Sequence, residues 1–136
     1  MDKATRMGPV VSKTQMGTVL SYIESGKREG ARLVAGGGRA DVGSGKGYFV
    51  QPTIFDGVTN DMKIAGEEIF GPVLSVIPFL SVEDGIAQGN QTSYGLAAAV
   101  WTRDVSTRRR SALTEIRPDF RRGPESDTKR GARRAP

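Results

Sequence analysis

Two adjacent carboxylates, Glu67 and Glu68, are the side chains of this sequence best placed to contact a ligand. They are followed by Ile69-Phe70, by Gly71-Pro72 and by a run rich in Val, Leu and Ile. The apolar run predicts a buried strand. The Gly-Pro pair predicts a fixed turn before it, because proline locks φ and glycine tolerates unusual φ/ψ. A carboxylate just before a buried strand lies at the rim of a sheet, where α/β proteins commonly bind ligands.

The same two carboxylates have two competing interpretations. They could form a general acid/base pair, because carboxylates can transfer protons when their pKa values are tuned. Adjacent carboxylates more often form a solvated pair or cap a neighbouring element, and the residues alone favour that second interpretation.

The chain contains no cysteine and no histidine. This composition excludes a disulfide, a thiolate nucleophile and a Cys/His zinc site within the 136 residues. It also removes histidine, the commonest general base near neutral pH. We therefore assign no catalytic residue and expect no metal site.

The sequence predicts a helix over roughly residues 13–29. Ser12 and Gln15 form a capping-box pair, and Gly30 follows as a C-terminal glycine. Gly26 lies inside the helix and weakens it by about 1 kcal/mol, so the apolar face of the helix must dock on another element. That face has helical spacing and consists of Met16, Val19, Leu20 and Ile23.

The remaining chain alternates predicted strands and helices, which favours an α/β architecture. Pro52 indicates that the predicted strand at 48–55 is an edge strand or carries a β-bulge. Tyr94 and Trp101 are expected in the core or at an interface. The predicted segments are strands at 31–35, 48–55, 73–79 and 96–102, a glycine-rich loop at 36–47, a turn and linker at 56–66, and helices capped by Ser81 and Asp104.

The loop at 43–47, Gly-Ser-Gly-Lys-Gly, superficially resembles a phosphate-binding loop. A P-loop needs glycine five positions before the Gly-Lys pair and Ser or Thr after the lysine. Ala40 and Gly47 occupy those positions, so the motif fails. A flexible hairpin loop is the better prediction.

Charge is distributed unevenly along the chain. Residues 1–100 carry nine Lys/Arg and ten Asp/Glu, whereas residues 101–136 carry eleven and five. From Thr114 onward the sequence is rich in Arg, Pro, Gly and Asp, which predicts disorder because little apolar surface is available for burial. Residues 108–110, three arginines, could form a nucleic-acid patch, but a solvated helix face is favoured.

Length and hydropathy place the chain in the class of single soluble domains. A chain of 136 residues can bury a real core. It has no apolar run long enough for a membrane span and no signal-peptide pattern, so we expect a cytoplasmic location.

The chain resembles the NAD(P)-dependent aldehyde dehydrogenases over roughly Met7 to Arg109. The most specific match is Glu67-Glu68-Ile69-Phe70-Gly71-Pro72, which is similar to the central signature of that family. The sequences of two segments, 19–24 and 52–60, most resemble those of bacterial enzymes that act on amino-aldehydes from polyamine breakdown. The other matches follow in the family's order at 7–12, 47–55, 62–64 and 94–102.

This resemblance implies a fold, an activity and a set of cofactor contacts. The fold would be part of the aldehyde dehydrogenase catalytic domain, an open twisted sheet with flanking helices. In the family, a cysteine thiolate attacks the aldehyde, a hydride passes to NAD or NADP, and a glutamate activates the hydrolytic water. By this resemblance Glu68 accepts hydrogen bonds from the nicotinamide ribose, Phe70 packs by the nicotinamide end, and Gln15 contacts the adenosine ribose. Thr18 departs from the lysine often found beside that glutamine.

The departures from the family predict a fragment. The nucleophilic cysteine, the water-activating glutamate and the cofactor domain have no counterpart in this sequence, so we expect the chain alone to be inactive. We expect a partial catalytic domain at 1–113 and a basic tail at 114–136 that is disordered or arises from a frameshift or fusion. The family's oligomerisation segment has no match either.

Two other functions remain open from the sequence. The chain could be a non-catalytic module that pairs with an intact homologue, or a small α/β domain whose basic tail binds nucleic acid. The expected partner of the parent enzyme is a small aldehyde, with no membrane.

Overall fold

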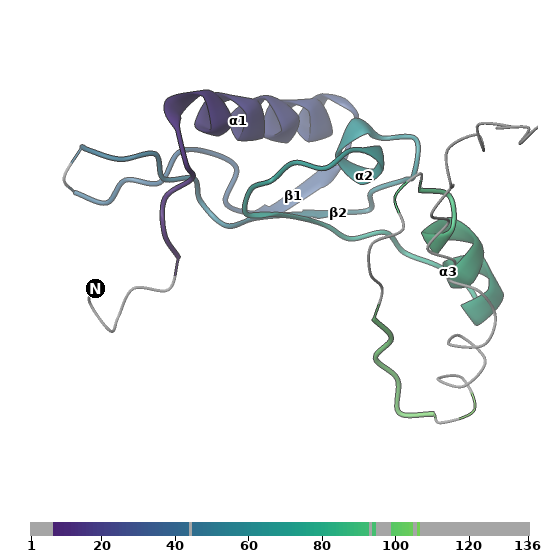
Figure 1. Ribbon diagram of the computed structural model, residues 1–136. Coiled ribbons are helices and arrows are strands. Elements are labelled where there is room, and N and C mark those ends of the chain that lie inside the picture. The colour runs from purple at the N-terminus through teal and green to yellow at the C-terminus, as the bar shows by residue number, and fades with distance from the viewer. Residues whose placement is uncertain (1–6, 44, 93, 95–98, 105, 107–136) are drawn as a thin grey trace, which may run out of the picture.

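The computed structural model describes residues 7–43, 45–92, 94, 99–104 and 106. Within these residues a small mixed sheet is flanked by helices, which confirms the predicted α/β class (Figure 1). Helices α1 and α2 lie on one side of the sheet, and α3 lies beyond its end (Figure 1). The elements in order are α1 (Lys13–Arg28), β1 (Arg32–Ala35), β2 (Thr53–Asp56), α2 (Lys63–Gly66), β3 (Val73–Ser75) and α3 (Val82–Gly89).

The sheet has the strand order β1-β2-β3. Strand β1 pairs antiparallel with β2, and β2 pairs parallel with β3. A parallel pair requires a crossover, and the loop with α2 provides it, so the signature segment enters β3 from the side of the sheet that α1 covers. The sheet thus brings the signature beneath α1.

Helix α1 begins as the sequence predicts. The Ser12 hydroxyl accepts a hydrogen bond from the backbone N–H of Gln15 at 3.0 Å. The reciprocal half of the predicted capping box is wrong, because the Gln15 side chain bonds elsewhere, as described below. The helix ends at Arg28, and Gly30 follows with φ +94°, a left-handed conformation that glycine adopts at little cost.

The core forms where α1 packs on β2 and α2. Burying an aliphatic or aromatic side chain of this kind contributes about 1.5–3 kcal/mol. Gly26 explains how closely the elements approach, since a Cβ there would lie 2.8 Å from Ile64 Cδ1. The glycine that weakens the isolated helix is therefore the one that lets it dock. The fully buried side chains are Val19, Ile23, Thr53, Phe55 and Val58.

Helix α2 lies inside the segment 56–66 that the sequence predicts as turn and linker, so that prediction is wrong for residues 63–66. The Met62 side chain provides no cap. Instead Glu29, at the end of α1, accepts a hydrogen bond from the backbone N–H of Lys63 at 2.7 Å and one from the Ser25 hydroxyl at 2.6 Å. A carboxylate from a distant segment thus stabilises the first turn of α2.

The predicted strand at 48–55 is shorter in the structure. Regular pairing starts at Thr53, and the residues before it make only an isolated antiparallel bridge between Arg39 and Val50. Pro52 accounts for the break, because proline has no N–H to donate to a ladder. The bridge closes the loop at 36–47 as a hairpin, as predicted.

The prediction that the strand after Pro72 is buried is wrong for this chain. Strand β3 spans Val73–Ser75, and Leu74 is 56% exposed. Its register partner Ile54 lies on the same face of the sheet, opposite α1. None of the described helices covers that face (Figure 1).

Helix α3 matches the prediction, with Ser81 as its N-cap. The Ser81 hydroxyl accepts from the backbone N–H of Asp84 at 3.1 Å, and Asp84 accepts from the N–H of Leu80 at 2.8 Å. The hydrogen bond from the Leu80 N–H, and after it one from the Gln88 side chain, lower the pKa of the Asp84 carboxyl. The acidic first turn also complements the helix dipole.

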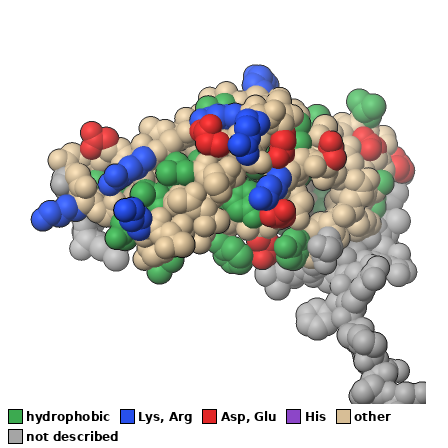
Figure 2. Space-filling view, turned by 90° about the horizontal axis from the view of Figure 1, so that it is seen from above, with side chains coloured by type: hydrophobic (Ala, Val, Ile, Leu, Met, Phe, Trp, Pro, Cys, Tyr) green, Lys and Arg blue, Asp and Glu red, His purple; other side chains and the backbone are tan. Residues whose placement is uncertain are grey.

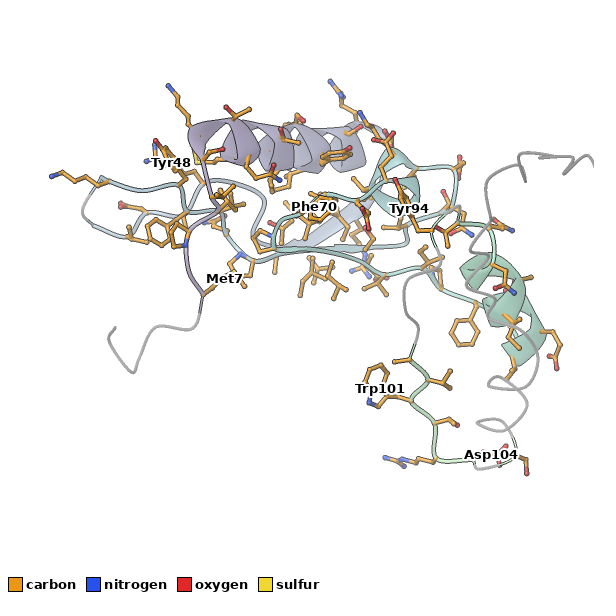
Figure 3. All side chains as sticks on the ribbon, in the orientation of Figure 1. Met7, Tyr48, Phe70, Tyr94, Trp101 and Asp104 are labelled. Atoms are coloured by element: carbon orange, nitrogen blue, oxygen red, sulfur yellow. The ribbon has the colours of Figure 1, made fainter. Side chains whose placement is uncertain are left out.

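The segment after α3 differs from the prediction. Trp101 is 88% exposed and Tyr94 is 48% exposed, so neither is a core residue in this chain. Trp101 lies well away from α1 and the sheet (Figure 3). Residues 99–102 form no strand, and 95–98 lie outside the described residues, as do the predicted last helix (apart from residue 106) and the tail from 114.

The surface over α1 and α2 carries basic and acidic side chains side by side (Figure 2). Two of its ion pairs are Lys27–Glu24 at 2.7 Å and Lys63–Glu67 at 3.9 Å. In the part of the chain that the structure describes, no helix is long and apolar enough to cross a membrane.

Candidate functional site

The signature segment, residues 67–71, connects the end of α2 to β3. Its backbone is unusual at Phe70, which has φ +52°, a left-handed conformation that non-glycine residues rarely adopt. The sequence places the conformational freedom at Gly71, and that expectation is wrong, because Gly71 has no positive φ. The strain falls on the aromatic residue instead.

Gly71 has a different reason to be glycine. A Cβ at this position would lie 2.5 Å from Val19 Cγ2 and 2.8 Å from Val19 Cγ1. Val19 is fully buried on the inner face of α1. The backbone of the signature therefore passes directly under the helix, and only a residue without a side chain fits there.

Glu67 is held by side chains from both helices. The Tyr22 hydroxyl of α1 donates to Glu67 Oε2 at 2.6 Å. Lys63 of α2 lies 3.9 Å from the same oxygen and 5.0 Å from the centre of the Tyr22 ring. Glu67 is also the C-cap residue of α2, but it caps through its backbone N–H, which donates to the carbonyl of Lys63, and not through its carboxylate.

Glu68, the neighbouring carboxylate, is exposed. Among the described residues it makes no hydrogen bond or ion pair, so its oxygens remain available as acceptors. Because successive extended residues point in opposite directions, anchoring Glu67 turns Glu68 away from the helices. The two carboxylates thus lie in different surroundings: Glu67 is bound to Tyr22, whereas Glu68 is exposed.

Gln15 lies directly over the signature. Its side-chain Nε2 donates to the carbonyl of Ile69 at 3.0 Å and to the carbonyl of Phe70 at 3.1 Å. The two carbonyl acceptors fix which end of the amide faces the segment, since only nitrogen can donate. The Gln15 side-chain oxygen consequently faces away as an acceptor.

Phe70 presents an apolar surface beside these polar groups. Its side chain is 76% exposed, below α1 in the view of Figure 3. The structure therefore brings the three predicted site residues together: Glu68 and Phe70 lie on one short segment under α1, and Gln15 contacts that segment from α1. Tyr22 and Val19 belong to the same arrangement and were missed, although their spacing from Gln15 along a helix could have indicated a shared face.

The chemistry of this donor set fits a ligand with hydroxyls and a flat ring. A carboxylate accepts hydrogen bonds only, an amide oxygen accepts one or two more, and an exposed aromatic ring offers a stacking surface. The sequence contains no cysteine and no histidine, and in the described part of the chain no three metal-ligating side chains cluster. The arrangement is thus suited to binding.

The glycine-rich hairpin forms a separate hollow of about 280 Å³. Arg39 donates to the carbonyls of Gly45 and Gly47 at 3.5 and 3.2 Å, so its guanidinium closes the hairpin from inside. That use agrees with the predicted hairpin loop. The lining consists of Arg39, Ala40, Asp41, Val42, Gly45 and Lys46.

Tyr22 provides a spectroscopic probe of the arrangement. Its hydrogen bond to Glu67 raises the pKa of the Tyr22 phenol, with smaller contributions from burial and from the charges of Glu67 and Tyr94. A raised pKa means that this interaction stabilises the folded state at neutral pH and is lost as pH rises through the raised value.

We therefore expect Glu67→Gln to lower the pKa of Tyr22 in an alkaline titration followed by tyrosinate absorbance. Because the chain has three tyrosines, the Tyr22→Phe variant is needed to show which part of the absorbance change belongs to Tyr22. Stability should fall less steeply at alkaline pH in Glu67→Gln than in the parent chain. An unchanged titration in Glu67→Gln would contradict the hydrogen bond.

Comparison with known proteins defines the class. The family model described as Aldehyde dehydrogenase family matches residues 1–115 of the chain. The chain belongs to this family.

Individual relatives agree with that membership. The betaine aldehyde dehydrogenase of Brucella anthropi is 55% identical over 107 residues, which are 78% of this chain and 22% of that protein. Aldehyde dehydrogenase 1A1 of Mesocricetus auratus is 52% identical over 105 residues, 77% of this chain and 20% of that protein. This chain thus spans about a fifth of the length of the curated relatives it matches.

Solved structures show the same relation. The Mycobacterium tuberculosis aldehyde dehydrogenase complexed with NAD+ superposes with a TM-score of 0.78 at 50% identity, over 82% of this chain and 23% of that one. The NAD+ complex of the Bacillus cereus enzyme gives 0.76 at 56% identity, over 82% and 22%. The fold described above is therefore that of a part of an aldehyde dehydrogenase.

Proposed function

We propose that this chain supplies the nicotinamide-ribose contact of an enzyme that oxidises an aldehyde to a carboxylic acid with NAD(P)+. The observation that carries the proposal is the exposed, uncommitted carboxylate of Glu68 between two anchored neighbours, next to the exposed ring of Phe70. Membership of the aldehyde dehydrogenase family and likeness to enzymes solved with NAD+ support it.

Each residue has a role that its chemistry suits. Glu68 accepts hydrogen bonds from two ribose hydroxyls, because a carboxylate has two acceptor oxygens and no donor. Phe70 packs against the nicotinamide end through its exposed ring. The side-chain oxygen of Gln15 accepts a hydroxyl of the adenosine ribose while its nitrogen stays on the segment. When bound, NAD(P)+ supplies the hydride acceptor.

The chain by itself is inactive under this proposal, because it contains no cysteine to form the covalent intermediate that the family uses. The substrate class is aldehydes in general, since identities of 55% and 52% to two enzymes of different names do not separate narrower classes. A boundary near residue 114 between partial catalytic domain and tail, and a cytoplasmic location, stay predictions.

The binding role can be tested with nicotinamide mononucleotide, which carries the nicotinamide ribose alone. Titration into the isotope-labelled 136-residue chain should shift the backbone amide signals of residues 68–71. Glu68→Ala should weaken binding about tenfold or more, because hydrogen bonds to a charged group are worth about 1.5–3 kcal/mol. Glu83→Ala, which removes an exposed carboxylate from α3, is the matched control and should leave binding unchanged.

Two results would overturn the proposal. One is an absence of shifts at 68–71 at millimolar nucleotide, and the other is equal binding by the parent chain and Glu68→Ala. The predicted inactivity has its own assay. Purified chain with an aldehyde and NAD(P)+ should produce no reduced nucleotide above a buffer blank, and sustained formation would refute it.

A further inference from the structure

Two hydrogen-bonded contacts on α1 flank Glu68. On one side the Tyr22 hydroxyl binds Glu67, and on the other the Gln15 amide binds the carbonyls of Ile69 and Phe70. Glu68 is the single residue between them that α1 does not hold. We call the contacts of Tyr22 and Gln15 with this segment the clamp, and Glu68 lies between them.

The spacing of the two contacts fits the geometry of both segments. Gln15 and Tyr22 are seven residues apart, which is about two helical turns and a rise of about 10 Å. Glu67 and Phe70 are three residues apart, and three residues of backbone can span up to about 10 Å. The order is reversed, since the earlier helix residue binds the later signature residue. The segment therefore runs antiparallel along α1 in one register.

The backbone at Phe70 gives a reason for a clamp. A left-handed φ of +52° costs a non-glycine residue of order 1–3 kcal/mol and persists only where neighbouring structure imposes it. The Gln15 side chain contacts the carbonyls on both sides of the Phe70 N–Cα bond, so it holds the residue in this conformation. Loss of that contact should release Phe70 and let the segment relax.

We propose that Gln15 and Tyr22 are positioning residues, which fix residues 67–70 on α1 so that Glu68 and Phe70 face the cofactor. This inference rests on the proposed function for the identity of the ligand. The positioning itself is a property of the chain without ligand and is tested without it.

The test uses Gln15→Met, which keeps the length of the side chain and removes the amide donor. Thr14→Met is the control, because Thr14 is an exposed neighbour in the same helical turn. A protease that cleaves after glutamate reports opening of the segment at Glu67 and Glu68, and cleavage after Glu24 and Glu83 reports the rest of the fold. Cleavage of a transiently open segment follows the population of the open form.

The expected result is a rise of about tenfold in cleavage after Glu67 and Glu68 in Gln15→Met, the size of effect that losing two net hydrogen bonds gives. Cleavage after Glu24 and Glu83 should stay within twofold, and Thr14→Met should match the parent chain. Tyr22→Phe should produce a smaller rise at the same two sites.

A second readout separates positioning from general support of the fold. If Gln15 sets the register, Gln15→Met should also bring the tyrosinate titration of Tyr22 toward its ordinary range, although Tyr22 itself is unchanged. Gln15→Lys should keep both the low cleavage after Glu67 and Glu68 and the Tyr22 titration close to those of the parent chain, because lysine can donate to both carbonyls. Gln15→Glu has no donor at neutral pH and should behave like Gln15→Met in both measurements.

Three outcomes would overturn the inference: unchanged cleavage after Glu67 and Glu68 in Gln15→Met, an equal rise after all four glutamates, or restoration by Gln15→Glu as good as by Gln15→Lys. None of them depends on nucleotide binding. A failed nucleotide titration with a confirmed clamp would instead refute only the proposed ligand.

Discussion

Phe55→Ala is expected to lower the free energy of unfolding by about 3–5 kcal/mol. Phe55 is fully buried on β2, and its ring faces Gly26 of α1 and Ile64 of α2. Truncation removes the contact surface that all three elements share and leaves a cavity. Small domains have about 5–15 kcal/mol of stability in total, so this loss is a large fraction.

Urea unfolding followed by circular dichroism measures this loss. Phe79→Ala is the matched control, because Phe79 is 61% exposed and its removal should cost about 1 kcal/mol or less. Phe55→Leu keeps most of the buried volume, so its free energy of unfolding should lie between those of the parent chain and Phe55→Ala. It therefore keeps the loss measurable if Phe55→Ala is largely unfolded. Equal losses in Phe55→Ala and Phe79→Ala would contradict the assigned core.

Gly71→Ala is expected to destabilise the fold by about 1–3 kcal/mol through overpacking. The added methyl would lie 2.5 Å from Val19 Cγ2, and Val19 is fully buried and cannot move away easily. Because Gly71 has no positive φ, the loss comes from the contact with Val19 and not from backbone strain.

A double-mutant cycle identifies this cause. Val19→Ala removes the methyl groups that clash, so the double variant Gly71→Ala/Val19→Ala should lose less than the sum of the two single variants by about 1 kcal/mol. Gly66→Ala is the control, since nothing lies within 4 Å of a Cβ there, and it should be neutral or slightly stabilising. Strict additivity in the cycle would show that Val19 is not the obstacle.

Both predictions converge on how this chain builds its candidate site. The signature lies where α1, α2 and β3 meet, so the packing that stabilises the fold also sets the register of residues 67–71. Changes in the core should therefore weaken nucleotide binding even where they touch no ligand group. Phe55→Leu offers a direct comparison with Glu68→Ala in the nucleotide titration.

The face of the sheet opposite α1 carries exposed apolar side chains. Leu74 is exposed on it beside its partly buried register partner Ile54, and Leu80 and Trp101 are exposed later in the chain. Exposed apolar side chains of this number favour association. This agrees with a chain that spans about a fifth of the length of its relatives.

Local sequence signals determined the elements that begin with a cap. Ser12 and Ser81 each precede a helical apolar pattern, and both helices start where those serines predict. The alternation of elements determined the α/β class, and the order of residues 67–72 determined the family. These features depend on residues close together in the chain, so they can be recognised without the fold.

Tertiary structure decided what each of these residues does. Gln15 looks like half of a capping box, yet its amide bonds to carbonyls 54 and 55 residues away. Glu29 caps a helix that starts 34 residues later, and Gly71 is glycine because of Val19. Likewise Glu67 and Glu68 are the same residue type, and the position of Tyr22 decides that Glu67 is anchored while Glu68 stays exposed. Contacts between distant segments depend on register and packing, which no local pattern of residues encodes.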